Sequence, residues 1–491
     1  MTNNMPLWTK KMPLAATVLL AVALLVYIVL RAVKVGFTHD ESWTFIGFVK
    51  EPVFDLFFNV RNWKSANNHP LNSRFMQLGF QLFGPQEWAL RIGSILGGLL
   101  FLLFAARTVS LWIPASSWLF FAAFCCLALN PFMIEFFALC RGYGLCVAFQ
   151  MMALFYFFRW VKEARRFDLF KASCALGMGV LANFTLVVLV AAFFVTVSLV
   201  YFFLRREERS WLGWLKMLAL PTLPMLVLVT LIFKPIRWIQ SVGEFEWGPH
   251  SFWETWRVLI QNFVCNPFGG RFEWWKTSAV VAGTILGILL FFFIIKRIKV
   301  TGIKNNEMLF SATALAISTM FVTVFQHYLV GANYLIGRTA ILFYPLLSTV
   351  FLLSLVDIQG RYKYGFVWSN MATLLLIINF WVSSNLRFSS EWWYDESSRE
   401  AVFFVNKQEN VTKKIKYGVS WIFGPATMFY QRNRDLQNLE NIEYDGSHND
   451  LAWIKNNNFD FIYVESENGK KLEDQYTEVK RFARGVVMRR K

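Results

Sequence analysis

The long apolar runs of this chain decide its fold, and the first of them is PLAATVLLAVALLVYIVLR at residues 13–31. This run follows Lys10 and Lys11 and holds no charged side chain before Arg31. About 20 apolar residues in a helix are enough to cross the hydrocarbon core of a bilayer. Because the run is long and lacks a small-residue cleavage pattern, we expect a retained transmembrane helix and not a removed signal peptide.

The composition of the whole chain is also that of a membrane protein. Of its 491 residues, 56% are hydrophobic and only 16% are charged, whereas soluble proteins carry about 25% charged residues. We therefore expect a polytopic α-helical membrane protein with about eleven transmembrane helices. The expected spans are residues 13–31, 88–106, 115–134, 141–158, 169–187, 188–204, 217–233, 277–295, 308–325, 336–356 and 365–383.

Basic residues predict how these spans are oriented. Loops rich in Lys and Arg stay on the cytoplasmic side of a membrane. If the amino terminus is cytoplasmic, the basic stretches 159–166, 296–304 and 361–363 all fall in inner loops. The net charge of +17 lies mostly in such loops and in the tail, so we do not expect the chain to bind nucleic acid.

Residues 71–83 are apolar but too short to cross, and Arg74 and Gln77 interrupt them. Counting them as a span would invert every later loop and place the basic loops outside. We therefore interpret them as a helix that lies at the outer surface, within a long outer loop at 32–87.

The chain is expected to divide into a transmembrane domain, 1–383, and a soluble extracytoplasmic α/β domain, 384–491. In the tail, the pattern predicts helices at 397–407 and 451–456, strands at 415–420 and 459–464, and one further strand within 479–489. A second outer loop, 234–276, is dense in Trp. Its aromatic rings either stack on sugars and close over lipid or form an interfacial belt.

Two adjacent acids, Asp40 and Glu41, stand among aromatic residues in FTHDESWTF at 37–45. Acids at a membrane surface are costly to desolvate, and for that reason they indicate function by default. A base at headgroup depth would meet a lipid-borne and a water-borne substrate together. The alternative is a structural role, because Asp and Glu also stabilise the first turn of a helix.

Further motifs follow the acidic pair in a fixed order: Asn68-His69-Pro70-Leu71, Glu87-Trp88-Ala89-Leu90-Arg91-Ile92-Gly93-Ser94, Asn130-Pro131, Cys140-Arg141-Gly142-Tyr143-Gly144-Leu145, and YLIGRTAILFYP at 334–345. Together with the acidic pair, they resemble the motifs of C-type (GT-C, glycosyltransferase family 39-like) membrane glycosyltransferases of the protein O-mannosyltransferase and aminoarabinose-transferase branch. The resemblance covers most of residues 13–383.

This resemblance implies an inverting glycosyltransferase that moves a sugar from a polyprenyl-phosphate donor to an acceptor hydroxyl. The implied partners are the lipid-linked donor, a glycan, lipid or protein acceptor, and membrane lipid. The implied location is the inner membrane of a prokaryote, with the active site on the extracytoplasmic face. The sugar, the acceptor and the oligomeric state are not indicated by the sequence.

By its match to the family motif, Asp40 is the expected base, and Glu41 is expected to orient Asp40 or the acceptor. Transfer also needs fixed positive charge for the released phosphate, and a guanidinium fork fits phosphate oxygens well. Snorkelling or headgroup contact is the alternative for the arginines. The expected substrate-binding residues are His69, Arg74, Arg91, Arg141, Tyr143 and Arg338.

The spacing of His39, His69 and the two acids is not a metal-binding signature. We assign no cofactor. Distant members of the fold use a divalent metal, so a metal is left open.

Two other functions also fit a polytopic membrane protein. Polysaccharide polymerases and ligases usually centre their chemistry on a late outer loop, whereas the acids here lie in the first one. Transporters and lipid flippases usually show internal repeats and paired broken helices, and the sequence shows neither. Both functions stay as alternatives.

Overall fold

The computed structural model describes residues 7–58, 65, 67–205, 210–264, 273–408, 414–444 and 450–491. The chain divides into two compact units. The first unit comprises Met1–Val29, Val53–Asn72 and Gly93–Ser384, and the second comprises Leu30–Pro52, Ser73–Ile92 and Asn385–Lys491. The second unit therefore joins the tail to two stretches that lie largely within the predicted first outer loop.

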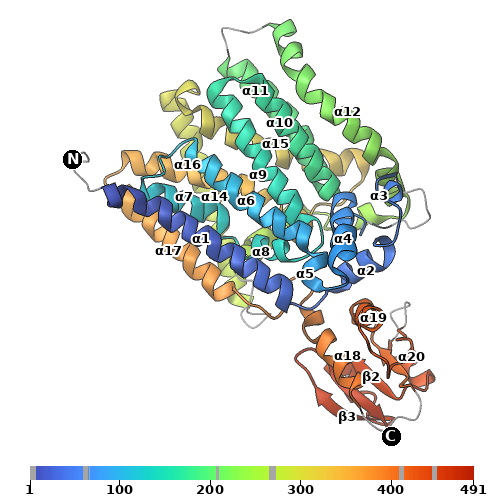
Figure 1. The fold of residues 1–491 in the computed structure, drawn as a ribbon. Helices are drawn as coiled ribbons and strands as arrows, with labels where there is room; N and C mark the ends of the chain where they lie inside the picture. The colour runs from blue at the N-terminus through green and yellow to red at the C-terminus, as the bar shows by residue number, and fades with distance from the viewer. Residues whose placement is uncertain are drawn as a thin grey trace. The chain divides into compact units, whose positions relative to one another are not determined.

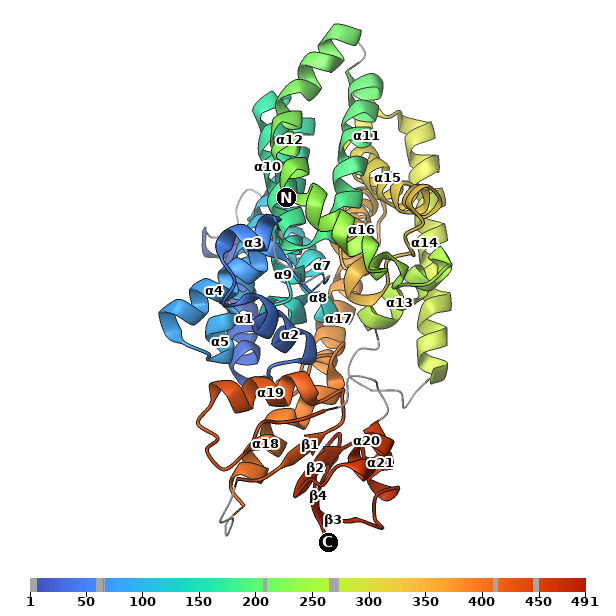
Figure 2. The same cartoon turned by 90° about the vertical axis from the view of Figure 1, so that its right-hand side faces the viewer.

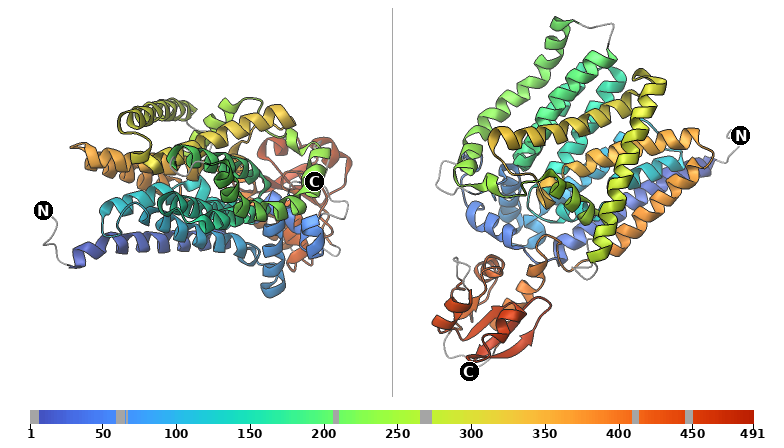
Figure 3. Two further views of the ribbon diagram at one scale, coloured as in Figure 1. Left: turned by 90° about the horizontal axis from the view of Figure 1, so that it is seen from above. Right: turned by 180° about the vertical axis from the view of Figure 1, so that it is seen from behind.

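The first unit is helical (Figure 1). Within it, α10 packs against α9 and α12, and α15 packs against α11 and α16; these helices remain neighbours when seen from above and from behind (Figure 3). Three helices, α1, α4 and α6, begin in one unit and end in the other. The helices are α1 (Leu7–Lys34), α3 (Val53–Phe58), α4 (Pro70–Phe83), α6 (Ile92–Ser110), α7 (Trp118–Ala128), α8 (Pro131–Glu135), α9 (Tyr143–Glu163), α10 (Arg166–Ala182), α11 (Val187–Leu204), α12 (Trp211–Ser241), α13 (Phe252–Val264), α14 (Glu273–Thr301), α15 (Glu307–Val330), α16 (Phe343–Arg361) and α17 (Gly365–Ser383).

The prediction of a polytopic helical membrane protein is confirmed. Among the described residues, nine helices are long and apolar enough to cross a membrane, and a bent pair brings the number to ten. The remaining expected span, 169–187, overlaps α10, which ends at Ala182 and has 17 residues. Side chains on the bilayer-crossing helices are often exposed, as on α14, because lipid is their solvent.

The bent pair shows how a local motif redirects the chain. The expected span 115–134 is broken after α7, and the helical segment Pro131–Ala138, which begins with α8, differs from α7 in direction by 67°. Asn130 caps α8, since its Oδ1 accepts the Met133 N–H at 2.9 Å, and Pro131 occupies the start of the helix. Proline suits a first helical turn but not a helix interior, so the Asn-Pro step ends one helix and starts another.

The second unit contains α2 (His39–Phe48), α5 (Glu87–Leu90) and the α/β fold of the tail, in which α2 packs against α19 (Gly424–Asn433). Its four-stranded sheet has the order β1-β2-β4-β3. The strands are β1 (Tyr417–Val419), β2 (Phe461–Val464), β3 (Tyr476–Arg481) and β4 (Val486–Arg490), and they lie beside α18 (Ser398–Asn406), α20 (Asp450–Asn456) and α21 (Ser466–Lys470) (Figure 2). Strands β1 and β2 are parallel, whereas β4 runs antiparallel to β2 and β3.

Most of the elements predicted for the tail are present as α18, β1, α20 and β2. The further strand predicted within 479–489 is present as β4, and β3, which was not predicted as a separate strand, pairs with it in a hairpin. The Phe482 N–H donates to the Gly485 carbonyl at 2.8 Å and closes the turn. The short, charged sequence of β3 hid the first strand, since only Tyr476 of its residues is buried.

Candidate active site

The acidic pair lies in the first turn of α2, in the second unit. Thr38 precedes the helix with extended backbone, and its N–H donates to Glu41 Oε2 at 3.0 Å. A carboxylate three residues into a helix commonly satisfies such an N–H group. The structural alternative is thereby confirmed for Glu41, which helps to start the helix that carries Asp40.

Glu41 is also one half of a buried ion pair. Both Glu41 and Arg91 have side chains that are 0% exposed. Arg91 binds both carboxylate oxygens, with Nε 2.8 Å from Oε1 and Nη2 2.6 Å from Oε2. Such a two-point bond fixes the direction of the carboxylate as well as its distance.

The remaining N–H groups of Arg91 donate to three backbone carbonyls near the end of α1. Nη1 donates to Ala32 and Val35 at 3.0 and 2.8 Å, and Nη2 donates to Gly36 at 2.9 Å. The last carbonyls of a helix have no partner within the helix and attract positive charge. Arg91 therefore ties the end of α1 to the start of α2, and it uses all five of its donors to do so.

Asp40 occupies the same turn but is partly exposed. Successive helix residues project about 100° apart, so Asp40 and Glu41 point in different directions. The backbone carbonyl of Asp40 accepts a hydrogen bond from the Thr44 hydroxyl at 2.9 Å. The pair is thus divided into one carboxylate enclosed by protein and one nearer the surface.

In the first unit, two motifs far apart in the sequence meet. The His69 ring lies 5.7 Å from the Tyr143 ring in an edge-to-face arrangement, and both side chains are buried. Gly142, which precedes Tyr143, has a φ of +76°. A Cβ atom at this position would lie 2.1 Å from the Ala182 carbonyl oxygen and 3.2 Å from His69 Cβ. Only glycine fits this left-handed, crowded position.

Arg141 is buried beside the same motif. Its Nη2 donates to Asn67 Oδ1 at 2.8 Å, so the residues before His69 hold the guanidinium. The other expected arginines are partly buried. Arg74, in the second unit, donates to Gln77 at 3.1 Å, and Arg338 lies in a short 3-10 helix, Gly337–Ala340, of the first unit.

Within the second unit, sequence reasoning missed Asp395. Burial raises the pKa of this carboxyl well above its ordinary value, and the nearby charges of Asp40 and Glu41 act in the same direction. Hydrogen bonds from the His39 N–H and the Ser398 hydroxyl oppose that shift. No local signal marks Asp395, because His39 is 356 positions away in the sequence.

Among the residues that the structure describes, no group of three His, Cys, Asp or Glu side chains could hold a metal ion. The His39 ring has protein partners on both nitrogens: Nδ1 lies 2.9 Å from the Ile422 carbonyl oxygen, and Nε2 lies 3.1 Å from Trp43 Nε1. A metal-bound nitrogen needs its lone pair for the ion, and Nε2 uses its lone pair to accept the Trp43 N–H.

In the Trp-rich loop, Trp256 of α13 donates to Thr284 of α14 at 3.0 Å, whereas Trp247 and Trp253 are exposed. Residues 265–272 of this loop lie outside the described ranges. The rings of this loop thus divide between helix packing and surface.

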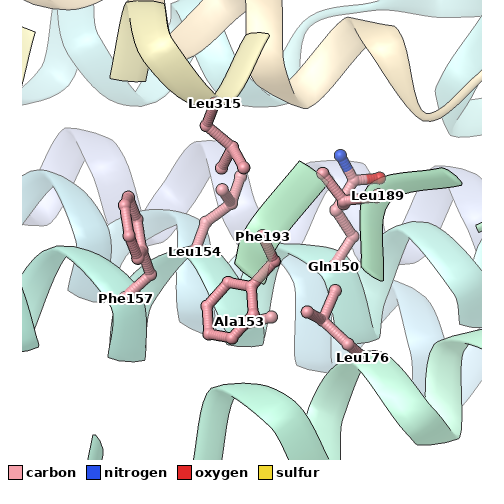
Figure 4. A pocket seen from close by; sticks show the side chains of 8 residues that line it. All are labelled: Gln150, Ala153, Leu154, Phe157, Leu176, Leu189, Phe193 and Leu315. Atoms are coloured by element: carbon pink, nitrogen blue, oxygen red, sulfur yellow. The ribbon is translucent and has the colours of Figure 1, made fainter. Parts of the chain in front are cut away.

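A small apolar cavity lies among four helices of the first unit, beside Gln150 of α9 (Figure 4). Leu176, Leu189 and Leu315 line it from α10, α11 and α15. Its volume of about 10 Å³ is the room of a single water molecule. A polyprenyl chain does not fit there.

The comparisons with known proteins agree with the motifs. The family described as dolichyl-phosphate-mannose-protein mannosyltransferase matches residues 67–238, which include His69 and Arg141. The apo structure of ArnT from Cupriavidus metallidurans is similar, with a TM-score of 0.51 and 13% identity over 96% of this chain and 97% of that one. The chain has the GT-C fold. The resemblance to GT-C membrane glycosyltransferases is confirmed.

Two further GT-C structures are similar. One is ArnT from the same organism bound to undecaprenyl phosphate, with a TM-score of 0.48 and 13% identity over 96% of this chain and 97% of that one. The other is the oligosaccharyltransferase AglB from Archaeoglobus fulgidus with an inhibitory peptide and a dolichol-phosphate, with a TM-score of 0.39 and 11% identity over 91% of this chain and 69% of that one. No curated protein matches the sequence.

Proposed function

We propose that this GT-C protein transfers a sugar from a polyprenyl-phosphate donor to an acceptor hydroxyl. The observation that carries the proposal is the division of the acidic pair. Glu41 is enclosed with Arg91, while Asp40 in the same helical turn is partly exposed. The family that matches residues 67–238 is described by a dolichyl-phosphate donor, which supports a lipid-linked sugar as the substrate class.

In the proposed reaction, Asp40 takes the proton from the acceptor hydroxyl. The acceptor oxygen attacks the anomeric carbon, the bond from that carbon to the phosphate oxygen breaks, and the phosphate leaves with the electron pair. One displacement of this kind inverts the anomeric configuration. Glu41 orients the turn that carries Asp40, and its bond to Arg91 fixes that orientation.

The proposed phosphate ligands are Arg74, Arg141 and Arg338. Guanidinium groups offer parallel N–H donors to phosphate oxygens. We propose a different role for Arg91, because its five donors are already bound to Glu41 and the end of α1. His69 and Tyr143 are proposed to contact the substrate near Arg141, since Tyr143 follows Arg141 by two residues and the His69 ring packs against Tyr143.

The protein is an integral membrane protein. We propose that it works in the inner membrane of a prokaryote and that its active site faces the extracytoplasmic side. The basic stretches 159–166, 296–304 and 361–363 then stay in the cytoplasm, as the positive-inside rule requires.

The test is transfer by purified protein in lipid nanodiscs, with labelled polyprenyl-phosphate sugars and a panel of glycan, lipid and peptide acceptors. We expect one donor to be consumed, and we expect Asp40→Asn to lower kcat by roughly 10²- to 10⁴-fold, the usual contribution of a general base. Asp435→Asn, an exposed carboxylate of the same unit, is the matched control and should keep full activity. Full transfer by the Asp40→Asn protein would contradict the mechanism.

A further inference from the structure

The carboxyl-terminal part of the second unit holds the start of α2. Asp395 is buried, and its Oδ2 accepts the backbone N–H of His39 at 2.6 Å. Its Oδ1 accepts the Ser398 hydroxyl at 3.0 Å. The first N–H groups of a helix have no partner within the helix, so Asp395 supplies one for the residue directly before Asp40.

The His39 side chain is held from the same part of the chain. The Trp43 indole can only donate, so His39 Nε2 accepts its N–H at 3.1 Å. The ring proton is therefore assigned to Nδ1, which donates to the Ile422 carbonyl at 2.9 Å. The imidazole also contacts the Tyr394 and Trp421 rings edge-on.

The segment that leads into α2 is anchored there too. The Phe37 N–H donates to the Tyr430 hydroxyl at 2.7 Å, and the Phe37 ring stacks on Phe429 at 4.1 Å. Arg399 donates to the Lys34 carbonyl at 2.9 Å. Polar and aromatic contacts from the tail thus surround the first turn of α2 and the residues before it.

We propose that the tail domain is a part of the catalytic apparatus that sets the position of Asp40, and that Asp395 and His39 are its positioning residues. The proposal rests on the function proposed above. Asp40 follows His39 directly, so any movement of His39 moves the Asp40 backbone. A displacement of about 1 Å at a reacting group can lower the rate about 10²-fold.

The first experiment compares two replacements of His39. Asn places its amide N–H where Nδ1 stands and can still donate to Ile422, whereas Gln reaches toward the Nε2 position and cannot. We expect His39→Asn to keep kcat within several-fold of the unchanged protein and His39→Gln to lower kcat by roughly 10- to 100-fold. The KM for the donor should change little in either variant, because His39 is not proposed to contact the donor.

The second experiment compares Asp395→Asn with Asp395→Ala. The Asn carbonyl oxygen can accept the His39 N–H as the carboxylate does, so activity should be close to that of the unchanged protein. The Ala side chain offers no acceptor, and kcat should fall by roughly 10- to 100-fold at an unchanged donor KM. If Asp395→Asn keeps its kcat while Asp395→Ala does not, then the hydrogen bond to the His39 N–H, and not the charge of Asp395, accounts for the effect.

Ile454→Ala is the control for a general loss of stability. Ile454 is fully buried in the hydrophobic core of the tail sheet, together with Phe459 and Ile462. This variant should lower the midpoint of thermal unfolding but keep kcat at temperatures where it is folded. If it lowers kcat as much as Asp395→Ala does, the positioning role is overturned.

The two proposals fail in different ways. If the unchanged protein transfers sugar, Asp40→Asn is inactive, and Asp395→Ala and His39→Gln keep full kcat, then the positioning proposal is wrong and the function stands. If the unchanged protein transfers no sugar from any donor, the proposed function fails. If Asp40→Asn transfers sugar at the full rate, the role of Asp40 as the base fails, and the positioning proposal falls with it.

Discussion

The neighbourhoods of Arg91 and Gln150 show two ways in which this protein encloses polar side chains. Arg91, in the second unit, has a protein acceptor for each of its N–H groups, and its carboxylate partner is equally buried. Gln150, in the first unit, donates to the Leu342 carbonyl at 2.7 Å, but its Oε1 has no partner among the described residues. Both side chains are fully buried.

The difference in hydrogen bonding between Arg91 and Gln150 indicates where the protein requires an exact arrangement of polar groups. Buried polar groups fix a unique arrangement when all of them are satisfied, and they only cost stability when they are not. The complete set of bonds is that of Arg91, which joins the end of α1 to the acidic turn, whereas the incomplete set of Gln150 lies beside a cavity with room for one water. Arg91→Ala and Gln150→Met test this contrast, and Asp395→Asn tests a further buried polar group that bonds to the first turn of α2.

The largest effect is expected for Arg91→Ala. The change leaves Glu41 buried without its partner and removes the donors to the end of α1, which should cost about 3–5 kcal/mol of stability. The midpoint of thermal unfolding in detergent measures the loss, and transfer activity should disappear with it. Arg387→Ala is the matched control, since its ion pair with Glu396 uses a guanidinium side chain that is 75% exposed and should matter little. Equal shifts for the two variants would contradict a structural role for Arg91.

A smaller effect is expected for the pH dependence at Asp395. Because burial raises the pKa of this carboxyl, the folded state binds one more proton than the unfolded state between the ordinary and the raised pKa. Stability therefore falls as the pH rises through that window. Asp395→Asn cannot titrate, so it should lack this part of the slope and gain stability relative to the unchanged protein toward neutral pH.

Thermal unfolding of the Asp395→Asn protein, followed from about pH 4 to pH 8 beside the unchanged protein, measures this difference. Asp435→Asn, with an exposed carboxylate, should follow the unchanged protein throughout. Parallel curves for Asp395→Asn and the unchanged protein would contradict the raised pKa.

The smallest effect is expected for Gln150→Met. Methionine has a similar volume. The change removes the unpartnered Oε1, which should raise stability, and it also removes the hydrogen bond to the Leu342 carbonyl, which should lower stability. We expect a change of less than about 1 kcal/mol, measured again by thermal unfolding. A loss as large as that of Arg91→Ala would remove the contrast between the two regions.

Sequence patterns predicted the elements whose signals are local. An apolar run long enough to cross a bilayer is visible without a structure, and so is the amphipathic segment that became α4. Asn130 and Pro131 are a local signal for a break in the helix. The residues on both sides of them are apolar, however, so one continuous span was expected where the chain bends. In the tail, β3 was not predicted as a separate strand, because half of its residues are charged and all but Tyr476 are exposed.

The interactions of the candidate site depend on residues far apart in the chain. The carbonyls that bind Arg91 precede it by more than 50 positions, and Asp395 bonds to a residue near the amino terminus. A single sequence contains no periodicity that pairs such positions. The catalytic and substrate-binding roles predicted for the site residues remain predictions; these residues are Asp40, Glu41, His69, Arg74, Arg91, Arg141, Tyr143 and Arg338.

The bonds around His39 have a consequence for biosynthesis. The first helix and the acidic turn precede Asp395 and Ile422 by a long stretch of chain, because these residues follow His39 by 356 and 383 positions. A nascent chain therefore lacks these hydrogen bonds at the turn that carries Asp40 until Asp395 and Ile422 have been made. Release of the chain before that point would leave the first turn of α2 without its hydrogen bonds to Asp395 and Ile422.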